Sequence, residues 1–253
     1  MRLTPEQKNF YDQQGYVLLP SLFSPEESAL YRAEVHALDA RQGDTDATWD
    51  SVKGDTAISH SHDVQFKSAA FTRLLVDPRL TGVAQDIIGP NVQLHHTKMF
   101  IKPPEKGSPF PMHQDYPYFP HRDHSLIAVI LFFDDAPVDK GCVTAYPGSH
   151  KLGPLEAFGS DHHVSPERFP AEGATPIPAK AGDALFFHYL LVHGSGVNIS
   201  DEARTTLLIQ LRDPVDIQMN DRHASRGQGM MLAGIDPVTK RFAFAWEEGQ
   251  DAA

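Results

Sequence analysis

The apolar positions of this chain follow a helical period in its first third and a strand period after it. Thr4-Pro5 and Ser24-Pro25 each place a hydroxyl group just before a proline and a glutamate, a pattern typical of helix starts. A third helical pattern ends at Gly89-Pro90. The sequence therefore predicts three helices, at residues 5–14, 25–40 and 71–87, and one early strand at residues 16–20.

From about residue 91 the apolar runs become short and are broken by Gly, Pro and Asp, which is typical of β-strands. The six runs are NVQLHHTKMFIKPP, SLIAVILFFDDAP, CVTAYPGS, ATPIPAK, GDALFFHYLLVHGS and RTTLLIQLRDP. Helices first and many strands later favour an α+β fold, in which helices pack on one face of a β-sandwich or barrel. We expect a jelly roll (a double-stranded β-helix, cupin-like), because this architecture leaves a mouth where strand ends converge.

The chain shows no internal repeat and no linker composition. We therefore expect a single domain over residues 1–253, with a helical part at about 1–90 and a jelly-roll core at about 91–215. The polar stretch 41–65 is rich in Gly, Asp and His and predicts a loop or lid.

Composition narrows the classes of function. The 22 Lys and Arg residues against 33 Asp and Glu residues give a net charge of −11, which repels nucleic acid and anionic membrane surfaces, so neither is an expected partner. The longest apolar run, LIAVILFF, is far shorter than the roughly 20 residues of a membrane-spanning helix. The N-terminus lacks a signal-peptide pattern and the single cysteine, Cys142, suits a reducing compartment, so we expect a cytoplasmic protein.

The pattern His-x-Asp occurs twice, at His113-Gln-Asp115 and at His121-Arg-Asp123. Residues i and i+2 of an extended segment share a face, so either pair could supply two of the three ligands of a non-haem iron facial triad. The first pair follows the apolar residues Phe110-Pro-Met, whereas the second carries an arginine that would bring positive charge towards a cation. We therefore predict His113 and Asp115 as metal ligands, and the second copy as a loop that could face substrate.

A facial triad needs a third ligand from a distant strand, and the run LFFHYLLVHGSGVN offers His188 and His193. His193 comes at the end of the apolar run, just before a Gly-Ser-Gly turn, where a strand would reach the mouth of a barrel. His188 lies in the middle of the run, which is more typical of a hydrogen-bonded histidine inside a strand. Arg204 follows His193 by 11 residues, enough for a turn that brings it back alongside the third ligand.

Four features together resemble the phytanoyl-CoA dioxygenase family of iron(II)/2-oxoglutarate oxygenases. These are HQDYPYFP, the PGSHK of residues 147–151, FFHYLLVHGSGVN and Arg204, in this order. The helical N-terminus, GPN at 89–91 and KPP at 102–104 are also similar, so the resemblance extends over most of the chain.

The resemblance implies Fe(II) as the metal, 2-oxoglutarate as cosubstrate and O2 as oxidant. The implied reaction hydroxylates an unactivated C–H bond of a small organic substrate and releases succinate and CO2. His113, Asp115 and His193 match the iron ligands, and Arg204 matches the arginine that binds the distal carboxylate of 2-oxoglutarate. Lys98 and Leu131 are candidates for the wall of the cosubstrate pocket, Leu131 standing where the best-known relative has a tryptophan.

Substrate choice should depend on residues beyond the metal. The candidates for substrate contact are Tyr116, Tyr118, His121 and His188, and the stretch 41–65 could close over them. Since basic residues are scattered, we expect a substrate smaller than a CoA thioester. The sequence leaves the oligomeric state open.

Two other classes of protein fit part of the pattern. A zinc hydrolase or isomerase on a cupin-like barrel could use the same His, Asp and His ligands, but Arg204 would have no specific role in such an enzyme. A catalytically silent barrel that binds a ligand is the other alternative, which the intact ligand set and arginine disfavour.

Overall fold

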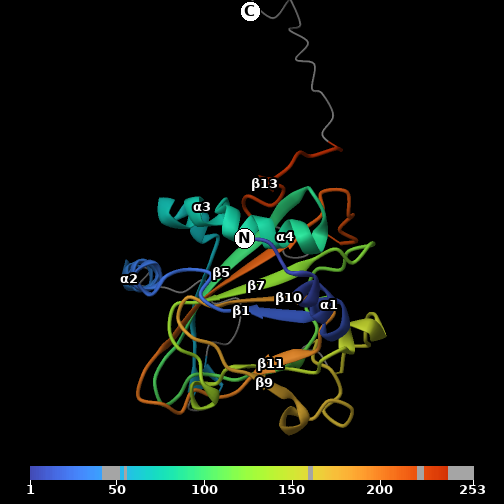
Figure 1. The fold of residues 1–253 in the computed structure, drawn as a ribbon. Helices are drawn as coiled ribbons and strands as arrows, with labels where there is room; N and C mark the ends of the chain where they lie inside the picture. Colours follow the sequence, from blue (N-terminus) through green and yellow to red (C-terminus); the bar gives the residue numbers. More distant parts are fainter. Residues whose placement is uncertain (42–51, 54–55, 159–161, 221–224, 239–253) are drawn as a thin grey trace, which may run out of the picture.

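Two antiparallel sheets face each other in the computed structural model, with helices on the outer side of the larger one (Figure 1). The structure describes residues 1–41, 52–53, 56–158, 162–220 and 225–238. This double-sheet arrangement is a jelly roll, so the predicted fold class is confirmed.

The larger sheet has seven strands in the order β1-β10-β7-β12-β5-β13, with β4 paired to another part of β5. Its strands are β1 (Tyr16–Leu19), β4 (Ser59–His62), β5 (Val92–Lys102), β7 (Ile127–Phe132), β10 (Ala184–His188), β12 (Arg204–Arg212) and β13 (Met231–Ala233). The smaller sheet has the order β6-β11-β8-β9, and its strands are β6 (Phe110–His113), β8 (Val143–Ala145), β9 (Thr175–Ile177) and β11 (His193–Ser195). A separate ribbon pairs β2 (Val52–Lys53) with β3 (Thr56–Ala57).

The helices lie on one face of the larger sheet, as predicted. They are α1 (Pro5–Gln14), α2 (Pro25–Arg41), α3 (Ala69–Leu75) and α4 (Pro78–Ile88), with short 3-10 turns at Val64–Phe66, Val138–Lys140, Ser149–Leu152 and Ala171–Gly173. The predicted start of α1 is confirmed and forms a capping box, since the Thr4 hydroxyl accepts from the Gln7 amide and the Gln7 side chain accepts from the Thr4 amide. Among the described residues, no helix is long and apolar enough to cross a membrane.

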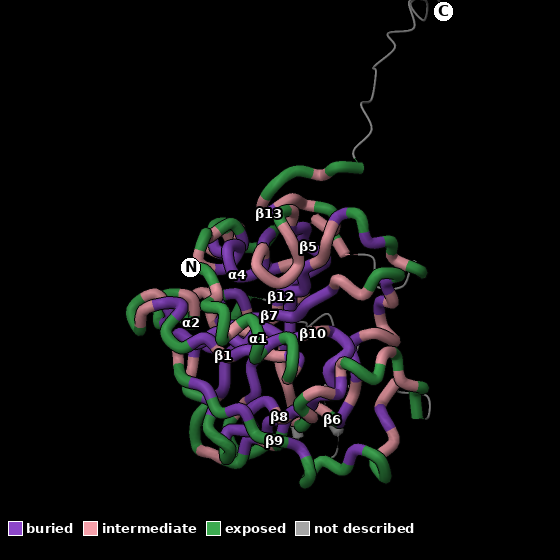
Figure 2. The backbone as a smooth tube through the Cα atoms, turned by 45° about the vertical axis from the view of Figure 1, so that its right-hand side comes forward, coloured by how far each residue is buried: buried purple, intermediate pink, exposed green. Residues whose placement is uncertain are grey.

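Alternation along β5 and β12 separates the helix-facing core from the space between the sheets. Met99 and Ile101 of β5, with Leu207 and Ile209 of β12, pack in the core cluster that the helices cover. The residues between them point the other way, towards the smaller sheet. Figure 2 shows that buried residues follow the strands, whereas exposed ones gather on the helices and loops.

Three sequence predictions about elements were wrong in detail. The helical pattern 71–87 forms two helices because Asp77-Pro78 starts a new one, with the Asp77 side chain accepting from the Arg79 amide. The run GDALFFHYLLVHGS forms two strands, β10 and β11, in different sheets, because it turns between them. Residues 59–62, predicted as loop, form β4; residues 42–51 and 54–55 of that stretch lie outside the described part.

Candidate metal centre and its two cavities

Three predicted ligands meet in the smaller sheet where β6 and β11 pair. His113 ends β6, His193 begins β11, and the two are direct partners in the antiparallel register. Asp115 follows two residues after His113, and its amide donates to the Tyr189 carbonyl, which fixes the turn. Their ligand atoms all lie within 4.8 Å of one another. In the described part of the chain this is the one group of His, Cys, Asp or Glu residues placed to hold a metal ion.

The ring orientations of both histidines fit a metal. The Nδ1 atom of His113 lies 2.8 Å from the Pro111 carbonyl oxygen, and that of His193 lies 2.9 Å from the Leu191 carbonyl oxygen. A carbonyl oxygen only accepts, so each Nδ1 carries the proton and each Nε2 of a neutral ring presents a lone pair. The two Nε2 atoms face Oδ1 of Asp115 at 3.6 and 3.9 Å. Three electron-pair donors that converge in this way can hold a cation between them.

Burial and neighbouring groups set the charge of these ligands. Burial, aided by the nearby His113, lowers the pKa of His193 to about 4, so its ring is neutral at physiological pH. Burial by itself would raise the pKa of Asp115, but the neighbouring His113 and His193 rings and the hydrogen bond from Gln210 outweigh it and lower that pKa. A neutral imidazole and an ionised carboxylate are the forms that bind a divalent metal.

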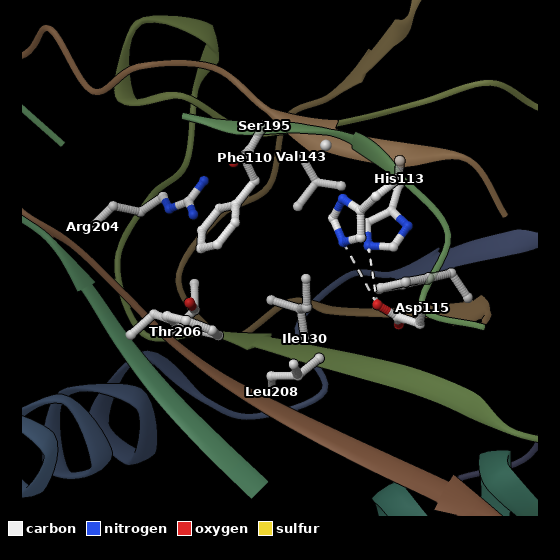
Figure 3. A pocket seen from close by; sticks show the side chains of 13 residues that line it. Phe110, His113, Asp115, Ile130, Val143, Ser195, Arg204, Thr206 and Leu208 are labelled. Carbon is white, nitrogen blue, oxygen red and sulfur yellow. Dashed lines mark ion pairs between the residues drawn. The ribbon is translucent and has the colours of Figure 1, made fainter. Parts of the chain in front are cut away.

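The first cavity runs from the metal centre to Arg204 (Figure 3). Its walls between the two ends come from Phe110, Ile130 and Leu208, with Thr206 near the arginine. Arg204 is 4% exposed, and its guanidinium donates to the Gly141 carbonyl while its Nε–H has no hydrogen-bond partner among the described residues. Burial lowers its pKa to about 10, so it stays protonated. A buried cation with an unused donor fits an anionic ligand.

Sequence reasoning missed two residues beside Arg204. Lys102, at the end of β5, pairs with Arg204 across the sheet, and its Nζ donates to Ser195 Oγ and to the Gly196 carbonyl, both at 2.8 Å. Ser195 lines the cavity two residues after His193, on the same face of β11. The sequence signal that could have found Lys102 is its place at the end of an apolar strand, two residues after Phe100. Residues two apart on a strand share a face, and Phe100 faces the cavity.

A second cavity adjoins the first at the metal centre. The two share Phe100, Phe110, His113, Asp115 and Leu208. The remaining walls of the second cavity are His62, His96, Lys98, Tyr118, Phe119 and Gln210. The metal centre therefore lies between a cavity that ends at Arg204 and one that contains Lys98.

The structure divides the other predicted residues between these two cavities and the core. Tyr118 lines the second cavity, as expected of a substrate contact; Lys98 lines it too, rather than the cavity of Arg204 for which it was predicted. Leu131 is buried in the helix-facing core, because its neighbour Ile130 takes the inward position on β7. Among the described residues, the lining of neither cavity includes Tyr116, His121 or His188.

The second His-x-Asp copy has a structural role. His121 is fully buried; its Nδ1 bonds to the Phe119 carbonyl oxygen and its Nε2 lies 3.3 Å from the Arg212 guanidinium. Asp123 is exposed and pairs with its neighbour Arg122. These contacts place the two members of this copy in different surroundings, so they do not converge on one metal position. His188 likewise bonds locally, accepting from the Leu190 amide at 3.1 Å.

Comparison with known proteins finds one family and many relatives. A family model described as phytanoyl-CoA dioxygenase matches residues 11–206. The peroxisomal phytanoyl-CoA dioxygenase of Bos taurus is 26% identical over 96% of this chain and 78% of its own length. An ectoine dioxygenase of Nocardia farcinica is 27% identical over 81% of this chain and 76% of its own length. Among solved structures, the epimerase SnoN in complex with Fe3+, alpha-ketoglutarate and nogalamycin RO is 25% identical, covers 91% of this chain and 96% of its own, and has a TM-score of 0.73.

Proposed function

The chain belongs to the phytanoyl-CoA dioxygenase family, and from this premise we propose how its residues serve an iron(II)/2-oxoglutarate-dependent dioxygenase. His113, Asp115 and His193 hold the iron. Arg204 binds the distal carboxylate of 2-oxoglutarate, with Lys102 and Ser195 beside it. The observation that carries this proposal is the convergence of two Nε2 lone pairs and one carboxylate oxygen at the inner end of a cavity whose other end is a buried arginine.

The bound iron and 2-oxoglutarate, with O2, supply the oxidation of an unactivated C–H bond, with release of succinate and CO2. The residues of the chain bind and orient the iron, the cosubstrate and the substrate. Arg204 offers a planar, permanently charged fork, which matches a carboxylate. Phe110, Ile130 and Leu208 surround the middle of the cavity with apolar surface, which excludes water from the reacting centre.

The second cavity is the proposed substrate site. Tyr118 and Phe119, three and four residues after Asp115, line it together with His113 and Asp115, so a substrate there lies next to the metal centre. The partner of this protein is therefore a small molecule. A single buried cysteine, Cys142, supports a reducing compartment such as the cytoplasm.

The proposal is tested with purified protein loaded anaerobically with Fe(II). We expect 2-oxoglutarate to bind to the loaded protein, and air with a suitable substrate from a metabolite panel to produce succinate. Zn(II) loading serves as the control, because a zinc hydrolase would need neither 2-oxoglutarate nor O2. Turnover with Zn(II) and no O2 would replace this proposal by the hydrolase alternative; absence of 2-oxoglutarate binding would favour a silent barrel.

A further inference from the structure

A buried asparagine joins the two strands that carry Lys102 and Arg204. Asn198 is 0% exposed and lies in the turn between β11 and β12. Its Nδ2 is within hydrogen-bond distance of three carbonyl oxygens: that of Glu202 at 2.8 Å, that of Pro103 at 3.0 Å and that of Lys102 at 3.3 Å. One side chain thus links the end of β5 to the segment that enters β12.

The orientation of this amide is fixed by donors on its other side. Its Oδ1 accepts from the Ser200 amide at 3.1 Å and from the Ser200 hydroxyl at 2.8 Å. A backbone N–H can only donate and a carbonyl oxygen can only accept, so exchanging the two ends of the amide would break contacts on both sides. The backbone of Asn198 is also held, since it pairs with Gly107 in both directions, at 3.0 and 3.3 Å.

The β-ladder does not extend beyond the residues that Asn198 holds. Lys102 and Arg204 form the last residue pair in the register between β5 and β12. Pro103-Pro104 follows, and proline has no N–H that could continue the ladder. Because the ends of elements open most easily, the positions of both side chains depend on what binds the chain just beyond the ladder. Asn198 donates hydrogen bonds to carbonyls on both sides of this end.

The packing around Asn198 is close. A Cβ atom on Gly107 would lie 2.7 Å from Cβ of Asn198 and 2.8 Å from Cβ of Lys102, so only glycine lets the chain after β5 approach both residues in this way. Lys102 in turn donates from Nζ to Ser195 Oγ at 2.8 Å, and Ser195 lines the first cavity together with Arg204. Direct contacts therefore lead from Asn198 through Lys102 to the distal end of that cavity.

We propose that Asn198 is a positioning residue for the cosubstrate: it holds Lys102 and Arg204 at the spacing that binds the distal carboxylate of 2-oxoglutarate. This inference rests on the proposed function, in which Arg204 binds that carboxylate. A site that already has its bound arrangement loses less free energy to ordering, so its ligand binds more tightly. In the described part of the chain, the hydrogen-bond partners of Asn198 all belong to this end of the cavity or to the turn itself, so its effect is confined to the distal carboxylate.

Binding of two acids that differ only at the distal end tests the proposal. Protein loaded anaerobically with Fe(II) is titrated in a calorimeter with 2-oxoglutarate and with 2-oxopentanoate, which has a methyl group in place of the distal carboxylate. We expect the wild type to bind 2-oxoglutarate about 10- to 100-fold more tightly than 2-oxopentanoate, the range of one or two charge-assisted hydrogen bonds.

The variant Asn198→Leu keeps the approximate volume of the side chain and removes its donor. Its affinity for 2-oxoglutarate should fall about 10-fold, whereas its affinities for 2-oxopentanoate and for Fe(II) should stay within about twofold of the wild type. Asn91→Leu is the matched control, because Asn91 lies just before the other end of β5, where its side chain accepts from the Ile235 amide at 3.0 Å. This control should bind both acids as the wild type does.

A milder variant covers the case in which Asn198→Leu does not fold. Ser200→Ala removes the hydroxyl donor to Asn198 and should weaken binding of 2-oxoglutarate about threefold, with 2-oxopentanoate unchanged. Wild-type affinity for 2-oxoglutarate in folded Asn198→Leu, or an equal loss for both acids, would overturn the proposal, and without that variant an unchanged preference in Ser200→Ala would do so. If the wild type itself does not prefer 2-oxoglutarate, the proposed function fails instead.

Discussion

Gln210 on β12 donates a hydrogen bond from Nε2 to Oδ2 of Asp115, across the space between the two sheets, at 2.7 Å. This contact leaves Oδ1 as the oxygen that faces both histidines. The amide thereby fixes which carboxylate oxygen is offered to the metal, a role that the side chains around metal ligands commonly have.

Replacing Gln210 should therefore weaken metal binding. We expect Gln210→Leu to reduce the affinity for Fe(II) by about 10- to 100-fold, because Asp115 loses its orienting donor. Anaerobic titration of the apoprotein with Fe(II) measures the effect, and the exposed Gln13→Leu is the matched control. Unchanged affinity in Gln210→Leu would mean that Asp115 is oriented by other contacts.

The two His-x-Asp copies should respond differently to loss of their aspartate. Asp115→Ala removes a metal ligand, so iron-dependent formation of succinate should disappear. Asp123→Ala removes an exposed partner of Arg122 and should leave activity within about twofold, since such surface pairs contribute little. Succinate assays on the two variants side by side check this, and equal loss in both would contradict the assignment of the first copy to the metal.

Arg204 should act mainly on the cosubstrate. Arg204→Ala removes a pair of charge-assisted hydrogen bonds to the distal carboxylate, so the KM for 2-oxoglutarate should rise by about 100-fold. Initial rates at varied 2-oxoglutarate concentration measure it. Arg122→Ala, an exposed arginine, is the control. A KM that stays at the wild-type value would exclude Arg204 from the cosubstrate site.

Binding of 2-oxoglutarate should be coupled to uptake of a proton by Lys102. Burial and then the charge of Arg204 lower the pKa of Lys102 to about 6, so its amine is mostly neutral at pH 7.5. A dianion beside Arg204 raises this pKa, and the complex therefore takes up a proton at pH values between about 6 and the raised pKa.

Calorimetry at pH 7.5 in two buffers of different ionisation enthalpy counts the protons taken up on binding. Lys102→Met should bind 2-oxoglutarate without this uptake. If both proteins take up the same number of protons, the titrating group is another residue.

Asp216 should matter for stability and not for metal binding. It is 2% exposed, and its carboxylate accepts from the Asp123 amide and from both the amide and the hydroxyl of Ser125, at 2.8 to 2.9 Å. Asp216→Ala leaves three part-buried donors unpaired and should lower the free energy of unfolding by about 2 kcal/mol. Urea denaturation measures this. A matching loss of Fe(II) affinity would show that this loop also positions the ligands.

The fold class and the candidate metal ligands could be read from local patterns. Helix caps, such as that of Thr4, are decided by a few neighbouring residues, and a His-x-Asp pair in an extended segment presents both side chains on one face. The return of the chain at Arg204 to the neighbourhood of His193 was also predictable from the sequence, since a short turn between them limits where the next strand can lie.

Other features needed contacts that no local pattern encodes. Whether Lys98 or Lys102 lies beside Arg204 depends on the register between β5 and β12, because a shift of four residues along a strand keeps a side chain on its face but moves it from one cavity to the other. The roles of His121 and Gln210 depend in the same way on partners about 90 residues away in the sequence.

The sequence by itself determined most of the elements and the types of candidate ligand in this protein, because helix caps, strand alternation and residue type are local properties. Only the tertiary structure decided which polar side chains share a cavity. The pairing of β12 with β5, and of β11 with β6, brings Arg204, Gln210 and the ligands together, and these pairings are set by packing across the whole jelly roll.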